Sequence, residues 1–294
     1  SRVTGSAHRI DEELLNSFRY SDINRILSFV PGVYAREEDG VGLRPNIGLR
    51  GATAERSVKV MLMEDGVPLS PAPYSAPAAY FFPLTARVVG VEVFKGPAAI
   101  QYGPQTVGGA INLLSAPIPT APTAMGEIAT GSDGYRHVHT RGGGQFGGFG
   151  VSGELVHVAS DGFKTLDGGG DTGFEKNELV LKGAHDLGPG RLELRFSYAD
   201  EISNETYLGL TESDLRDSPN RRYAASALDR MEWEWLAGRA DWQQPLLGGA
   251  LQLTAYAQQL DRAWLKFNNF AGANIGDVLA NPEGPFSQLF VSIL

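Results

Sequence analysis

The sequence contains no cysteine in its 294 residues. The chain therefore cannot form a disulfide framework, a thiolate metal site or a cysteine nucleophile. It also contains no run of 18 consecutive apolar residues, which excludes a membrane-spanning helix. The first stretch, "SRVTGSAHRIDEELL", has no basic segment followed by an apolar one, so any signal peptide is expected upstream of it.

Positive charge is scarce, with 25 Lys and Arg against 34 Asp and Glu and a net charge of −9. A nucleic-acid partner is not expected, because neutralising a phosphate backbone requires a basic surface. The sequence shows no Ser-His-Asp order and no paired-carboxylate motif of the kind that nucleophilic or acid–base catalysis uses. We therefore expect neither an enzyme nor a cofactor, and we predict no catalytic residue.

Glycine, in contrast, is abundant, with 37 residues or nearly twice the usual share of about 7%. The segment "KGPAAIQYGPQTVGGAINLLS" at 95–115 follows the strand-like "RVVGVEVF" at 87–94. A phosphate-binding loop of the Walker type places its Lys after the glycines, whereas Lys95 precedes them here. The composition instead predicts a backbone that turns sharply and packs closely against its neighbours.

The first 118 residues predict a small α/β unit with long polar loops. A helix is expected within 20–32, because Ser21 or Asp22 can cap it and apolar residues follow at helical spacing. A hairpin is expected over 57–70, with its turn at Asp65-Gly66. Further strands are expected at 87–94 and 108–115.

The proline-rich stretch "APIPTAPT" at 116–123 predicts an extended linker, after which polar and apolar residues alternate. In "GRLELRFSYADE", for example, Leu192, Leu194, Phe196 and Tyr198 share one face. Seven strands are predicted, near 124–132, 135–146, 148–159, 175–187, 190–201, 232–245 and 249–267. Such segments, joined alternately by short turns and long loops, are typical of a transmembrane β-barrel. A soluble antiparallel sandwich is the alternative.

Two further features bear on the barrel hypothesis. The four tryptophans, Trp233, Trp235, Trp242 and Trp264, are candidates for the membrane interfaces. Seven strands are too few to close a bacterial barrel, so either the sheet is not a barrel or the chain is a fragment. The terminal "FSQLFVSIL" resembles a strand cut in its middle, which favours the fragment.

Five motifs of the first half follow one another along the chain. They are the helix ending in Val30-Pro31-Gly32-Val33, "LRG" at 49–51, "MEDGVPL" at 63–69, "VEVFKGPAAIQYGP" at 91–104 and "GGAINLLS" at 108–115. In this order and spacing they resemble the plug domain of TonB-dependent outer-membrane receptors, over about residues 10–118. "PAPYS" at 71–75 and "YGPQTVGGAIN" at 102–112 look most like the ferric citrate receptor branch.

The resemblance implies an α+β plug domain at 1–118 and the N-terminal part of a transmembrane β-barrel at 119–294. Since the barrels of these transporters have about 22 strands, the barrel is expected to be incomplete. The implied function is energised uptake of an iron chelate, with a ferric citrate-like complex as the expected cargo, across the outer membrane of a Gram-negative cell. TonB and outer-membrane lipid are the implied partners, with the TonB-contacting segment expected upstream of residue 1.

Two alternatives stay open at this point. One is a receptor of the same class for another siderophore, cobalamin or a sugar. The other is a soluble β-rich binding module, which would lack the lipid-facing apolar rows of a barrel.

The resemblance also assigns roles to charged residues. Arg50, Glu92 and Lys95 match the positions by which such plugs hold to the barrel wall. Buried charges need partners, so we expect Arg50 and Glu92 to pair, with acids of the barrel completing the cluster. The alternative is a surface pair of Glu92 and Lys95.

Substrate contacts in this family come from the loops at the plug apex and from inward-facing barrel residues. Arg44 and Arg56 are the predicted donors to an anionic chelate, because arginines bind carboxylates through paired hydrogen bonds. Tyr74 is predicted as a hydrogen-bonding or packing wall. The acids at 37–39 lie close to Arg44 and oppose an anion, unless they repel other anions or face water.

No metal site is predicted. His137 and His139 share a face of one strand, but no third ligand is evident. Three aspartates in "SDGFKTLDGGGDTG" at 160–173 do not match the EF-hand spacing, so a flexible extracellular loop is expected there.

Overall fold

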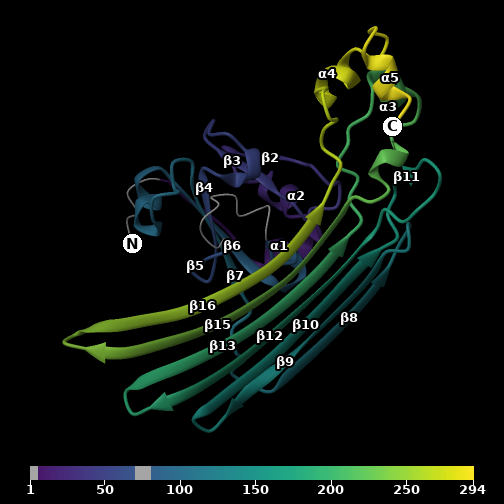
Figure 1. The fold of residues 1–294 in the computed structure, drawn as a ribbon. Helices are drawn as coiled ribbons and strands as arrows, with labels where there is room; N and C mark the ends of the chain where they lie inside the picture. The colour runs from purple at the N-terminus through teal and green to yellow at the C-terminus, as the bar shows by residue number, and fades with distance from the viewer. Residues whose placement is uncertain (1–5, 70–80) are drawn as a thin grey trace.

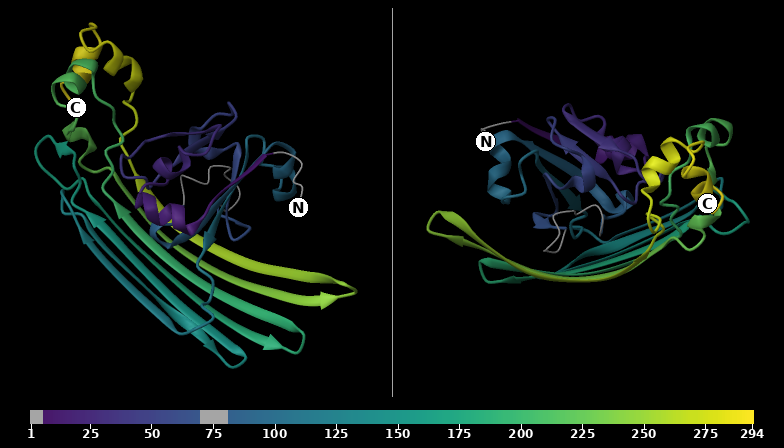
Figure 2. Two further views of the ribbon diagram at one scale, coloured as in Figure 1. Left: turned by 180° about the vertical axis from the view of Figure 1, so that it is seen from behind. Right: turned by 45° about the horizontal axis from the view of Figure 1, so that its top comes forward.

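The computed structural model describes residues 6–69 and 81–294 and consists of an N-terminal domain and a sheet of long strands (Figure 1). The N-terminal domain lies on the concave side of the long sheet, which curves around it (Figure 2). Within the described residues, no helix is both long and apolar enough to cross a membrane. The order of the two parts agrees with the predicted fold class.

The N-terminal domain is built on a five-stranded sheet with the order β1-β6-β7-β4-β5. Its strands are β1 (Ser6–Ile10), β4 (Val60–Glu64), β5 (Val67–Pro68), β6 (Val88–Lys95) and β7 (Gly109–Ser115). The hairpin predicted over 57–70 and the two later strands are confirmed. Asp65 and Gly66 form the hairpin turn with φ angles of 49° and 81°, the left-handed conformation of a two-residue type I′ turn.

The helix predicted within 20–32 is α2 (Ile23–Leu27). Asp22 caps it by accepting a hydrogen bond from the backbone nitrogen of Asn24 at 2.8 Å. Four further helices and strands of this region were not predicted from the sequence, because each is short and only weakly periodic. They are β1 (Ser6–Ile10), α1 (Glu12–Phe18), β2 (Val33–Arg36) and β3 (Asn46–Leu49). The short 3₁₀ helices η1 (Glu55–Ser57) and η3 (Thr85–Arg87) complete the domain before β6.

The glycine-rich segment that follows β6 is tightly packed, as expected. Residues Gly96–Tyr102 form the 3₁₀ helix η4, and the chain then enters β7 at Gly109. Gly109 has a φ of 150°, and a Cβ there would lie 2.5 Å from the carbonyl oxygen of Phe94. The position therefore accepts glycine alone without a shift of the neighbouring strand.

The long sheet contains seven antiparallel strands that follow one another in sequence order, from β8 at one edge to β16 at the other. The strands are β8 (Thr123–Thr130), β9 (Arg136–Phe146), β10 (Phe149–Ser160), β12 (Phe174–Leu187), β13 (Gly190–Ser203), β15 (Arg230–Leu246) and β16 (Gly249–Leu265). The seven predicted strands are thus confirmed. β7 ends at Ser115 and β8 begins at Thr123, so the predicted domain boundary after residue 118 falls between them.

Two-residue turns join the strands at one end of the long sheet, and long connections join them at the other. The long connections contain β11 (Thr165–Leu166), paired in parallel with β14 (Arg221–Arg222), as well as α3 (Glu212–Asp217) and η5 (Ala224–Ser226). After β16 the chain forms α4 (Ile275–Ala280) and α5 (Ser287–Val291) at the same end (Figure 1).

The strand predicted at the end of the chain is wrong, because residues 287–291 form the helix α5. The backbone nitrogen of Ser292 donates to the carbonyl oxygen of Gln288, 3.2 Å away. The ring of Phe290 packs on the ring of Phe270, with centroids 4.8 Å apart. Short apolar runs do not by themselves distinguish a strand from a helix, and here this tertiary contact accompanies the helix.

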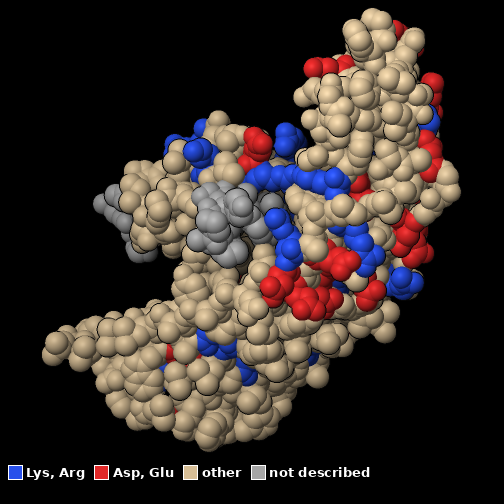
Figure 3. Space-filling model, in the orientation of Figure 1, with Lys and Arg blue, Asp and Glu red and all other residues tan. Residues whose placement is uncertain are grey.

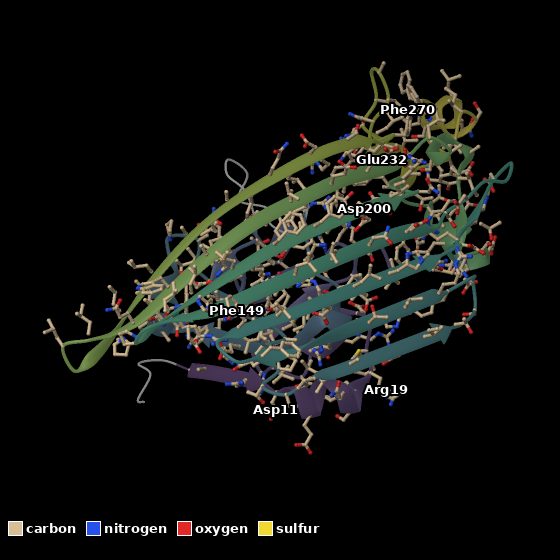
Figure 4. The ribbon with its side chains drawn as sticks, turned by 90° about the horizontal axis from the view of Figure 1, so that it is seen from below. Asp11, Arg19, Phe149, Asp200, Glu232 and Phe270 are labelled. Carbon is tan, nitrogen blue, oxygen red and sulfur yellow. The ribbon has the colours of Figure 1, made fainter. Side chains whose placement is uncertain are left out.

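The two faces of the long sheet differ in polarity. The outer face carries rows of exposed apolar side chains (Figure 4), among them Leu181, Leu194, Phe196, Leu236 and Leu253. The inner face carries charged side chains that are buried against the N-terminal domain. The predicted alternation of residues 192–198 is therefore confirmed, with the apolar members outward. Apolar rows of this kind favour the membrane barrel over the soluble β-rich module.

The tryptophan prediction is wrong for three of the four residues. Trp233, Trp235 and Trp264 point to the inner face, and only Trp242 points outward. The ring of Trp235 stacks on Phe81 of the N-terminal domain with centroids 4.1 Å apart, and Trp233 meets the same ring edge-on. These two tryptophans form part of the core between the two parts of the molecule.

Candidate functional site

A pocket of about 450 Å³ lies where the N-terminal domain meets the long connections of the long sheet. We call it the apex pocket. It is bounded by the segment 36–44 between β2 and β3, by residues 162–174 before β12, and by residues 203–207 after β13. Figure 3 shows that acidic and basic side chains gather at this junction, whereas the hairpin end of the sheet is largely uncharged on this face.

The segment 36–44 is held in shape by Asp39. Its carboxylate accepts hydrogen bonds from the backbone nitrogens of Val41, Gly42 and Arg44 at 2.6–2.7 Å. Because this carboxylate is hydrogen-bonded to the backbone amides of its own loop, it repels an anionic ligand less than its formal charge suggests.

Arg44 lines the apex pocket but is only 4% exposed. Its guanidinium is hydrogen-bonded to Glu201 of β13, and its Nη2 atom lies 3.2 Å from Oε1 of Glu205. Burial alone would lower the pKa of Arg44, but the two carboxylates raise it above its ordinary value. Arg44, the predicted donor to an anionic chelate, is thus already paired with Glu201 of β13 and with Glu205 of the connection that follows it.

Arg56 also lines the pocket and also has an internal partner. Its Nη2 atom lies 2.8 Å from Oε1 of Glu38, and its guanidinium lies 5.6 Å from the ring centroid of Trp264. Tyr74, the third residue predicted at the apex, lies outside the described residues.

A chain of buried ion pairs runs from the apex pocket along the inner face of the long sheet. Lys176 lies 3.5 Å from both Glu201 and Glu178, and it donates to the carbonyl oxygen of Phe82 at 2.5 Å. Arg87 of the N-terminal domain hydrogen-bonds Glu178 in turn.

The chain of ion pairs ends at the β4–β5 hairpin. Arg87 and Arg195 both hydrogen-bond Glu64, and Nη1 of Arg195 lies 2.7 Å from Oδ2 of Asp65. Burial would raise the pKa of Glu64, but the two arginines hold it far below its usual range. Every charge in this chain has an opposite charge beside it, which offsets the cost of removing it from water.

The residues predicted to lock the domain to the wall lie elsewhere. Glu92 sits opposite Arg9 on the neighbouring strand, with 3.9 Å between the charged atoms, and it accepts from Asn112. Lys95 donates to the carbonyl oxygen of Pro31 at 2.7 Å, within the same domain. Among the described residues Arg50 forms no ion pair with Glu92, because Arg50 occupies a left-handed turn after β3 (φ 53°) and is exposed.

The residues that do join the two parts were missed in the sequence. Among them are Glu64, Arg87, Lys176, Glu178, Arg195 and Glu201. One signal was the recurrence of charged residues at every second position of a strand, as at 176 and 178, which places them on the same face. That signal marks an inward face but does not name the partner.

The two histidines of β9 have local partners. Nε2 of His139 lies 2.7 Å from Oε1 of Glu154 on the adjacent strand. In the part of the chain that the structure describes, no three His, Asp or Glu side chains converge closely enough to hold a metal ion. The aspartates of the 160–173 loop serve structure as well, since Asp167 pairs with Arg221 at 2.9 Å.

Comparison with known proteins identifies the N-terminal domain. Residues 1–110 match the family model described as the TonB-dependent receptor plug domain. The vitamin B12 transporter BtuB of Photobacterium profundum is 28% identical over 225 residues, covering 74% of this chain and 34% of that protein. The chain thus spans about a third of the length of this relative.

Solved structures share the fold of both parts. The unliganded ferric citrate transporter FecA has a TM-score of 0.73 at 19% identity, over 90% of this chain and 41% of that one. The ferric yersiniabactin uptake receptor FyuA of Yersinia pestis has a TM-score of 0.72 at 18% identity, over 88% and 41%. At these identities the likeness is one of fold and does not specify a branch.

TonB-dependent receptors are outer-membrane proteins of Gram-negative bacteria, and they transport their ligands without catalysing a reaction on them. The match of residues 1–110 supports an outer-membrane location for this chain. It is consistent with the apolar outer face of the long sheet. Residues 1–110 thus match the TonB-dependent receptor plug domain, and the two parts together share their fold with transporters and uptake receptors of known structure.

Proposed function

We propose that the protein is a TonB-dependent importer of an iron chelate, with a ferric citrate-like complex as its cargo. The observation that carries the proposal is the apex pocket, which joins plug and barrel and contains both predicted arginines. A ligand bound there touches the segment 36–44 of the plug and the 203–207 connection of the barrel at once. The similarity in fold to the ferric citrate transporter FecA supports the same cargo class.

TonB is the proposed energy source, because it is the partner after which the family is named. In this proposal the ligand enters the apex pocket and the contacts of segment 36–44 change. TonB then pulls on the plug from the periplasmic side. The segment that TonB contacts is proposed to precede residue 1. Outer-membrane lipid is the proposed neighbour of the exposed apolar rows of the long sheet.

A second cargo, cobalamin, is favoured by two observations. The curated relative is a vitamin B12 transporter. The arginines of the apex pocket are also paired with protein carboxylates, which leaves less positive charge for an anion than the sequence suggests. Other siderophores and sugars lack such a specific indication.

Calorimetry with the full-length receptor in detergent tests the cargo. Ferric dicitrate is titrated against iron-free citrate, a neutral ferric hydroxamate and cyanocobalamin. The proposal predicts micromolar or tighter binding of ferric dicitrate alone, weakened at least tenfold by Arg56→Ala. Arg216→Ala, which removes an exposed arginine on α3, is the matched control and should bind like the wild type. Tight binding of cyanocobalamin, with no binding of ferric dicitrate, would show that cobalamin is the cargo in place of ferric citrate.

A further inference from the structure

The apex pocket holds protein carboxylates at the positions where an anionic ligand would be expected. Arg44 is shared by Glu201 and Glu205, and Arg56 is paired with Glu38. Any carboxylate of a ligand must therefore displace an internal carboxylate before it reaches either guanidinium.

Glu205 is the replaceable member of the Arg44 group. Glu201 is 1% exposed and lies between Arg44 and Lys176, so both of its neighbours hold it in place. Glu205 lies in the connection after β13 and lines the pocket. Its Oε1 atom is near Nη2 of Arg44 but makes no hydrogen bond of acceptable geometry within the described structure.

Several buried atoms around the pocket lack hydrogen-bond partners among the described residues. They are Nε of Arg44, Oγ1 of Thr206 and Oε1 of Glu205. Arg44 borders the pocket although its side chain is almost entirely buried. Since buried polar groups are almost always paired, the two donors among these atoms are ready to receive an oxyanion group.

We propose that Glu205 is the specificity-determining residue of the apex pocket, where it competes with the carboxylate or other oxyanion group of a ligand for Arg44. This inference rests on the proposed role of the pocket as the ligand site. A ligand enters when its oxyanion binds Arg44 more strongly than Glu205 does, and Glu205 then turns away into the pocket. Weakly coordinating anions are kept out.

The charges around Glu205 set the pH at which it competes. Burial raises the pKa of Glu205, and the carboxylates of Glu201, Asp39 and Glu38 raise it further, while Arg44 opposes them. Lys164 also interacts with Glu205: burial lowers the pKa of Lys164, and the negative charge of Glu205 opposes this shift. Because a protonated Glu205 no longer attracts Arg44, oxyanion binding is expected to strengthen as the pH falls toward the raised pKa.

The test uses sulfate, which stays dianionic between about pH 5 and 8, as a probe that carries no iron. Its affinity for the full-length receptor in detergent is measured by calorimetry at constant ionic strength. Glu205→Gln should bind sulfate at least tenfold more tightly than the wild type at pH 7.5, because a unit charge this close to the anion is removed. Glu212→Gln removes an exposed charge of α3 and should match the wild type.

A second measurement does not depend on the variant. Wild-type affinity for sulfate should rise as the pH is lowered from 7.5 toward the raised pKa of Glu205, and the rise should vanish in Glu205→Gln. Equal affinities of wild type and Glu205→Gln, or a wild type that does not respond to pH, would overturn the proposal. If Glu205→Gln gains affinity for sulfate while no form binds ferric dicitrate, the cargo is wrong and the competitor role stands.

Discussion

Arg87 neutralises two buried carboxylates at once, Glu64 of the plug and Glu178 of the barrel. Replacing it by Met keeps the apolar stem and removes only the guanidinium. Glu64 then retains Arg195, and Glu178 retains Lys176 at 3.5 Å. Loss of one partner from a buried ion pair lowers the free energy of unfolding by about 3–5 kcal/mol. Because each carboxylate keeps one cation, we expect a loss at the lower end, about 3 kcal/mol.

Urea unfolding of the receptor in detergent measures this loss. Trp233 and Trp235 pack on Phe81 of the plug, so tryptophan fluorescence reports the separation of plug and barrel. With a slope of about 2 kcal/mol per M, the Arg87→Met midpoint should fall by about 1.5 M. Arg9→Met is the matched control, because Arg9 is exposed and its pair with the half-buried Glu92 contributes less than about 1 kcal/mol.

A double variant checks the cause of the effect. Adding Glu178→Gln to Arg87→Met removes the carboxylate that has lost its arginine and should restore part of the lost stability, giving a coupling of about 1 kcal/mol or more. If Arg87→Met shifts the midpoint no further than Arg9→Met does, the buried ion pairs do not hold the plug and the reasoning is refuted.

Three further predictions use the same receptor. Gly109→Ala should cost about 2 kcal/mol, because its Cβ meets the carbonyl oxygen of Phe94, whereas Gly183→Ala, with no atom within 4 Å, should be neutral. Glu64 contributes stability above the ordinary Glu pKa of about 4.3 and loses it as the pH falls through its lowered pKa, so the unfolding midpoint should drop in acid and the drop should flatten in Glu64→Gln. Asp39→Ala should speed hydrogen exchange at the three amides that its carboxylate binds, by about 5–30-fold for a loss of about 1–2 kcal/mol, and unchanged exchange there would contradict its role.

Much of the fold could be predicted because its signals are local. Alternation along 190–201 predicted the strand and the residues that share a face, and the Asp65-Gly66 pair predicted its own turn. The tryptophans show where this reasoning fails. Trp233 and Trp235 are two positions apart on one strand, so the sequence places them on the same face. Only their packing against Phe81 of the plug shows that this face is the inner one.

The site was less predictable because its partners are distant in sequence. Arg44 and Glu201 are separated by 157 positions, and Arg195 and Glu64 by 131. In the sequence a loop arginine such as Arg44 has no visible partner. Only the structure shows the acid of the barrel strand, Glu201, that neutralises it. Arg44 and Arg56, predicted from their loop positions, both line the apex pocket, but their ion pairs with Glu205 and Glu38 were not predicted.

Uptake of radioactive iron from ferric dicitrate tests the central claim most directly. The full-length receptor is expressed in cells that lack their own ferric citrate receptor, with and without a functional TonB. The account predicts accumulation of iron in the TonB-containing cells and only background in the others, with Arg216→Ala behaving like the wild type. Equal accumulation in both strains would contradict energised transport, and background in both would reject the cargo.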